Sequence, residues 1–165
     1  MNEMIDNQTL EIPSPLGGLS LEARGGLLVA LRFAGSAGHA PTDPGDELDA
    51  AALQLAEYFS GKRRAFELPL AQPSAAFDRE VLNVVGEIQY GERTSYGRVT
   101  AALGLGRDQV RKVAAAIGRN PLPILVPCHR VVGADGSLTG YGGGLERKAH
   151  LLALEAGQLE LVASA

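Results

Sequence analysis

The chain has 165 residues, 45% of them hydrophobic, and a formal net charge of −4. This length suits one ordinary domain or two small ones, and the composition excludes a disordered chain. A single cysteine excludes an intrachain disulfide and a thiolate zinc site. Because no apolar run could span a bilayer and the acidic start is unlike a signal peptide, we expect a cytoplasmic protein with a reduced thiol.

The first part of the chain predicts a small sheet and one helix. Residues 9–35 alternate apolar stretches with Gly and Pro, which is typical of strands joined by tight turns. A loop over 37–46 precedes a helix that begins at Asp46 and ends before Gly61, with helical spacing through Leu48, Ala52, Leu55 and Phe59. Residues 66–70 predict one more strand, and 71–75 predict a boundary. We therefore expect an α+β fold with domains at 1–72 and 73–165.

The second domain begins with predicted helices. Ser74 is a candidate N-cap for a helix that carries apolar residues inward, namely Phe77, Val81, Val84, Val85 and Ile88. Thr94 or Ser95 caps a short helix through residue 103, and a glycine turn leads to another helix at about 108–118. Two short helices joined by a glycine turn outline a helix-turn-helix.

The helix at 108–118 has an unusual outward face. Its expected apolar face is Val110, Val113, Ala114 and Ile117. The other sides carry small and cationic residues: Arg111, Lys112, Ala115, Ala116, Gly118 and Arg119. The formal net charge is +5 over residues 91–130, whereas it is −7 over residues 1–90 and −2 over residues 131–165. Such a face fits close approach to DNA with cations on phosphates. The alternatives are a solvated surface and alanines that simply favour helix.

The only cysteine, Cys128, lies between the apolar run at 123–127, a predicted buried strand, and a glycine-rich loop at 133–144. A thiol attacks as its thiolate, so it needs a base. His129 is adjacent, but neighbours in an extended segment point apart, so we expect a relay through one water. Glu155, in a helix predicted over 145–156, could orient the imidazole. The alternatives are a buried cysteine, a core imidazole, a cysteine hydrolase and a thiol sensor.

Residues 77–157 resemble the O6-alkylguanine-DNA alkyltransferase family, also called methylated-DNA–protein-cysteine methyltransferases. The segments that carry the resemblance are "NPLPILV", "PCHRVV" and "TGYGGGLERKAHLLALE". It implies a small ribonuclease-H-like N-terminal unit and a mostly helical, winged-helix-like C-terminal domain with a helix-turn-helix. It also implies direct-reversal DNA repair, in which the alkyl group of O6-alkylguanine, and of O4-alkylthymine, passes irreversibly to Cys128 in one turnover after nucleotide flipping.

The resemblance also implies roles for individual residues. Cys128 is the nucleophile, His129 the base through a water, and Glu155 its orienter. Asn120 braces the turn before the cysteine, and Tyr96 donates a hydrogen bond to N3 of the leaving guanine. Arg111 inserts into the duplex. The remaining DNA contacts are Lys112, Ala115, Ala116, Gly118, Thr94, Ser95 and Arg130, and the guanine pocket is Tyr141, Gly142, Gly143 and Val131.

We expect no cofactor and no metal, a monomer in solution, and double-stranded alkylated DNA as the partner, with cooperative binding on DNA left open. Two other functions compete with alkyl transfer. One is a binding module that recognises alkylated DNA without chemistry, and the other is a thiol hydrolase of small esters.

Overall fold

The computed structural model describes residues 6–33 and 45–158, and the chain forms two compact units, Met1–Gln72 and Pro73–Ala165. The predicted loop at 37–46 lies almost wholly outside the described residues. The first unit holds an antiparallel sheet of β1 (Asn7–Ile12), β2 (Leu19–Arg24) and β3 (Leu27–Phe33). Gly25 and Gly26, with φ of 58° and 80°, form the two-residue turn between β2 and β3.

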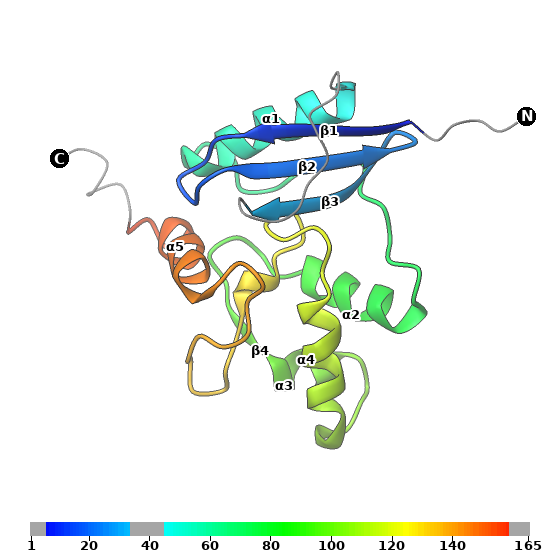
Figure 1. The fold of residues 1–165 in the computed structure, drawn as a ribbon. Coiled ribbons are helices and arrows are strands. Elements are labelled where there is room, and N and C mark those ends of the chain that lie inside the picture. Colours follow the sequence, from blue (N-terminus) through cyan, green and yellow to red (C-terminus); the bar gives the residue numbers. More distant parts are fainter. Residues whose placement is uncertain (1–5, 34–44, 159–165) are drawn as a thin grey trace, which may run out of the picture. The chain divides into compact units, whose positions relative to one another are not determined.

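Helix α1 (Asp46–Phe59) packs on this sheet (Figure 1). Its buried residues are Leu48, Ala51, Leu55 and Tyr58, so the apolar face is turned from the predicted one, and Ala52 and Phe59 are only partly buried. The strand predicted at 66–70 is wrong in extent. Only Leu70 bridges to Leu28 of β3, because this segment contains Pro69, which has no N–H for a ladder.

The second unit is mostly helical. It contains α2 (Ala76–Gly86), β4 (Thr94–Ser95), α3 (Tyr96–Ala102), η1 (Arg107–Gln109) and α4 (Val110–Gly118). The chain then forms η2 (Cys128–Arg130), β5 (Val131–Val132) and α5 (Leu145–Glu155). Helices α2, α3 and α4 pack on one another around a core that includes Val81, Val99 and Val113. Ala75, and not Ser74, is the N-cap of α2, and no side chain caps it.

The segment before the cysteine is not the predicted strand. Ile124 has φ of 74°, a left-handed conformation that is uncommon for a β-branched residue, and the backbone N–H of Val126 bonds back to Leu122 O at 2.9 Å. Residues 122–126 therefore form a buried turn. The strand comes after the cysteine instead, where β5 pairs in parallel with β4. This pairing places Cys128 directly before a strand that is tied to the start of α3.

Candidate active site and nucleic-acid interface

The predicted helix-turn-helix is formed by α3 and α4. Ser95 Oγ accepts a hydrogen bond from the Arg98 backbone N–H at 3.1 Å, which caps α3. The buried face of α4 is Val113, Ala116 and Ile117. The expected outward position of Ala116 is wrong, because this residue is 0% exposed. Its small side chain lets α4 approach the core closely.

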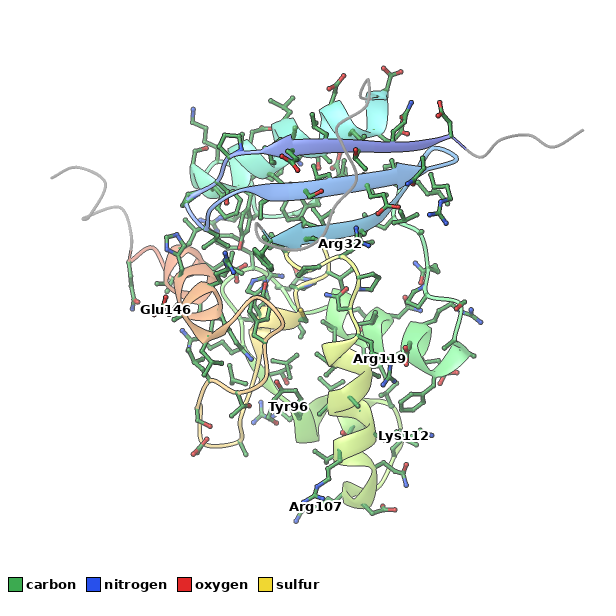
Figure 2. The ribbon with its side chains drawn as sticks, viewed as in Figure 1. Arg32, Tyr96, Arg107, Lys112, Arg119 and Glu146 are labelled. Carbon is green, nitrogen blue, oxygen red and sulfur yellow. The ribbon has the colours of Figure 1, made fainter. Side chains whose placement is uncertain are left out.

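The exposed residues of α4 divide between two sides. Lys112 Nζ lies 4.3 Å from the ring centroid of Phe77 in α2, and Arg119, which follows α4, pairs with Asp78 at 2.8 and 3.0 Å. Figure 2 shows Lys112 and Arg119 on the side of α4 toward α2. Arg111 and Gly118 instead line a cavity, and Ala115 is exposed between the two sides.

This cavity has a volume of about 560 Å³, a size typical of small-molecule pockets. Helix α4 forms one wall with Val110, Arg111, Ala114 and Gly118, and the other walls are Tyr96, Thr139, Gly140, Tyr141 and Gly142. Most of these residues are small or aromatic. Tyr96 and Tyr141 also pack against the core cluster that contains Cys128, so they connect the cavity with the thiol.

Two expected pocket residues lie elsewhere. Val131 is 0% exposed in the core, and its side chain does not line this cavity, so its place in the guanine pocket stays a prediction. Strand β5 pairs Val131 with Thr94, a residue that borders a second cavity together with Arg98 and Val99 of α3. Gly143 does not line the cavity, and its carbonyl oxygen accepts a hydrogen bond from Arg147 at 3.0 Å.

Cys128 starts the single turn η2 and is 7% exposed. Burial raises the pKa of its thiol, while a hydrogen bond with the Asn120 side chain and the charge of Lys148 oppose that rise. The Asn120 amide also donates to Val126 O and accepts from Leu122 N, both at 3.0 Å. Asn120 therefore fixes the turn at 122–126 that delivers the cysteine.

His129 and Glu155 form the buried pair that the sequence suggested. Nε2 of His129 lies 2.7 Å from Oε1 of Glu155, and both side chains are almost fully buried. Although burial alone would raise the pKa of Glu155, hydrogen bonds from His129 and Arg130 lower it to about 2. An ionised carboxylate can only accept, so Nε2 of His129 carries a proton. Burial lowers the pKa of His129, which leaves Nδ1 as the free acceptor of a neutral imidazole.

Nδ1 of His129 is buried, and no hydrogen-bond partner for it exists among the described residues. Such an orphaned lone pair, on the residue that follows the thiol in the chain, is suited to receive a proton through a water. Because Cys128, His129 and Arg130 lie in one 3₁₀ turn, they are not in the extended geometry assumed from the sequence.

Arg130 does not face DNA. Its side chain is 7% exposed and binds both oxygens of Glu155, at 2.9 and 2.8 Å, and Ile88 O at 2.6 Å. The expected DNA contact is therefore wrong, since all of these bonds hold Arg130 inward. Arg130 instead ties η2 to α5 and to the segment that follows α2, and it keeps Glu155 charged.

Sequence reasoning missed Lys148, which is 0% exposed. Its Nζ donates to Val131 O at 2.6 Å and Thr139 O at 2.8 Å, and it lies 5.8 Å from the ring centroid of Tyr96. A signal was present: Lys148, Leu151, Leu152 and Glu155 follow the spacing of one helix face, and all four are buried. A lysine within such a face needs buried partners.

Among the described residues, no helix has the length and apolar character needed to cross a membrane. Within the same ranges, no group of three His, Cys, Asp or Glu side chains is arranged to hold a metal ion.

Known proteins share both units of this chain. Residues 76–157 match the model for the DNA binding domain of 6-O-methylguanine DNA methyltransferase, and residues 11–72 match the model for its ribonuclease-like domain. The chain is 41% identical to the methylated-DNA–protein-cysteine methyltransferase of Mycolicibacterium paratuberculosis over 92% of this chain and 93% of that protein. It is 48% identical to the constitutive enzyme of Bacillus subtilis over 62% of each chain.

Solved structures of similar proteins agree with these family matches. The Mycobacterium tuberculosis O6-methylguanine methyltransferase has a TM-score of 0.84 at 37% identity, covering 95% of this chain and 99% of that one. The M. tuberculosis OGT in complex with DNA has a TM-score of 0.84 at 40% identity, covering 92% of this chain and 94% of that one. These similarities confirm the resemblance drawn from residues 77–157 and the α+β fold class. The chain belongs to the 6-O-methylguanine DNA methyltransferase family.

Proposed function

We propose that this protein repairs DNA by transferring the alkyl group of O6-alkylguanine to Sγ of Cys128, once per molecule. The observation that carries the proposal is the buried series of Cys128, His129 and Glu155, whose core cluster is packed against Tyr96 and Tyr141 of a cavity of about 560 Å³ on the helix-turn-helix. The first domain, 1–72, supports the second, 73–165, which binds DNA and performs the transfer. The proposed compartment is the cytoplasm.

The chemistry follows from the protonation states. The thiol proton passes to Nδ1 of His129 through a water, and the imidazolium is stabilised by Glu155. The thiolate attacks the alkyl carbon, so that a C–S bond forms as the C–O6 bond breaks. Guanine leaves as an anion, and the Tyr96 hydroxyl donates to its N3. The resulting thioether has no bond that water hydrolyses easily, so the protein ends alkylated.

The target nucleotide must leave the base stack before the thiolate can reach it, at a cost of a few kcal/mol. Ala115 and Gly118 on the exposed part of α4 allow close approach to the minor groove. Arg111 lies at the cavity wall, where it could fill the space left by the flipped nucleotide. Lys112, Thr94 and Ser95 contribute further contacts to DNA outside this cavity, and Tyr141 and Gly142 enclose the base. O4-alkylthymine is a second substrate of this proposal.

Incubation with duplex DNA containing O6-methylguanine, followed by intact mass measurement, separates the candidate functions. Alkyl transfer predicts a gain of one methyl group on wild-type protein and none on Cys128→Ala, with DNA affinity retained in the variant because phosphate contacts supply most of it. Tight lesion binding with no mass gain would support a binding module. Repeated turnover of small esters would support a thiol hydrolase. Loss of all DNA binding in Cys128→Ala would contradict the separation of binding from transfer.

A further inference from the structure

Lys148 is a fully buried cation that the proposed chemistry does not use. Burial of an ammonium group is costly unless its donors are bonded. Two of its three donors reach backbone carbonyl oxygens, Val131 O at 2.6 Å and Thr139 O at 2.8 Å. Lys148 therefore ties α5 to the end of η2 and to the loop that carries Thr139.

The carbonyl of Thr139 has a second donor. The Tyr96 hydroxyl lies 2.9 Å from the same oxygen, and Lys148 Nζ lies 5.8 Å from the Tyr96 ring centroid. A carbonyl oxygen has two lone pairs, so it can accept from both groups at once. A cation on one lone pair withdraws electron density from the oxygen, which makes it a weaker acceptor for the second donor.

This arrangement bears on how Tyr96 could serve the reaction. Tyr96 and Thr139 both line the cavity, yet the hydroxyl that should donate to the leaving base is already bonded to Thr139. The hydroxyl must leave that oxygen to bind another acceptor. With Lys148 in place, the oxygen keeps a strong donor after the hydroxyl has left, and the loop stays anchored.

We propose that Lys148 is a positioning residue that anchors the Thr139 carbonyl and thereby frees the Tyr96 hydroxyl to move to the leaving base. This inference rests on the proposed alkyl transfer. It assigns Lys148 no contact with the substrate, and its effect should depend on the hydroxyl of Tyr96.

Two uncharged substitutions separate the donor of Lys148 from its charge. Lys148→Gln keeps an N–H donor, whereas Lys148→Met removes it, and both lack the cation that acts on the thiol. In single-turnover transfer from O6-methylguanine in duplex DNA, we expect Lys148→Met to be slower than Lys148→Gln by about tenfold, the cost of losing one hydrogen-bond partner. Equal rates for the two variants would overturn the inference.

Two controls locate the effect. In a Tyr96→Phe background, the difference in transfer rate between Lys148→Gln and Lys148→Met should vanish, because no hydroxyl then shares the Thr139 carbonyl. Alkylation of Cys128 by iodoacetamide does not need Tyr96, so both variants should react with it equally. A difference that persists with Tyr96→Phe, or that appears equally with iodoacetamide, would overturn the inference.

If circular dichroism shows that Lys148→Met does not fold, the transfer rate of Lys148→Gln is compared with that of the protein that keeps Lys148. The comparison is made once with Tyr96 and once with Tyr96→Phe. A loss of about threefold that disappears with Tyr96→Phe supports the inference, and an undiminished loss overturns it. Failure of the proposed function is distinguishable, because the wild-type protein would then accept no alkyl group at all.

Discussion

Nε2 of His129 and Oε1 of Glu155 lie 2.7 Å apart, and their side chains are 0% and 1% exposed. Arg130 binds the same carboxylate through two nitrogens. One glutamate thus fixes the tautomer of the histidine and neutralises a buried arginine. Its removal should affect both the reaction and the stability of the fold.

Replacement of Glu155 by glutamine should lower the free energy of unfolding by about 3 kcal/mol, because Arg130 is left buried without its counter-ion. Urea denaturation measures this loss. Asp78→Asn is the control, since it breaks the more exposed pair with Arg119 and should cost at most about 1 kcal/mol. Equal losses in the two variants would contradict a special role for the buried pair.

Stability should fall as the pH is lowered, through two groups. His129 has a folded-state pKa below its ordinary value of 6.5, because burial disfavours its charged form. Its contribution to the stability of the fold is complete above pH 6.5 and is lost as the pH falls below that value. The pKa of Glu155 drops from 4.5 to about 2, so its contribution is lost between those values.

Urea midpoints measured from pH 7.5 down to pH 3 test this dependence. The midpoint of the wild-type protein should fall in the range of His129 and again in that of Glu155. The second fall should be smaller in Glu155→Gln, which has no carboxylate to protonate. A wild-type midpoint that stays constant between pH 7 and pH 5 would argue against a buried neutral imidazole.

Arg111 and Lys112 are neighbours on α4 with different surroundings. Arg111 lines the cavity, whereas Lys112 lies over the Phe77 ring at 4.3 Å. We expect Arg111→Ala to slow repair in duplex DNA by about tenfold more than in single strands, since only the duplex requires a filled base stack. Lys112→Ala should slow repair of duplex and single-stranded substrates alike. An equal loss on duplex and single-stranded DNA for Arg111→Ala would remove its intercalating role.

Gly118 and Gly86 each end a helix, and a Cβ atom added at either position meets nothing within 4 Å. Alanine at either site should therefore stabilise the protein by about 0.5 kcal/mol. Only Gly118 lines the cavity. We expect Gly118→Ala to weaken binding to lesion-containing duplex by about tenfold through misfit, with Gly86→Ala unchanged. Band-shift titration and thermal melting provide the two readouts, and unchanged DNA affinity in Gly118→Ala would oppose a close approach there.

The sequence predicted elements whose signals are local. Ser95 as a cap and the glycine turn before α4 were readable because capping and turn chemistry involve residues close in the chain. The strand predicted at 123–127 failed because an apolar run does not specify a pairing partner, and the short β5 formed with β4 instead.

The site was only partly predictable for the same reason. Cys128, His129 and Glu155 carry recognisable chemistry, but the inward position of Arg130 depends on Glu155, 25 residues away. Ala116 was misplaced because alanine fits buried and exposed helix faces equally well. Lys148 was overlooked because a lysine is ordinarily solvent-exposed, and only the fold reveals its two carbonyl partners.

The most direct measurement is a titration with a molar excess of duplex DNA containing O6-methylguanine, followed by peptide mass analysis. The account predicts that product formation stops at about one equivalent per protein. All of the added methyl groups should then lie on the peptide that contains Cys128. Product beyond one equivalent, or a methyl group on any other residue, would contradict transfer to a single nucleophile.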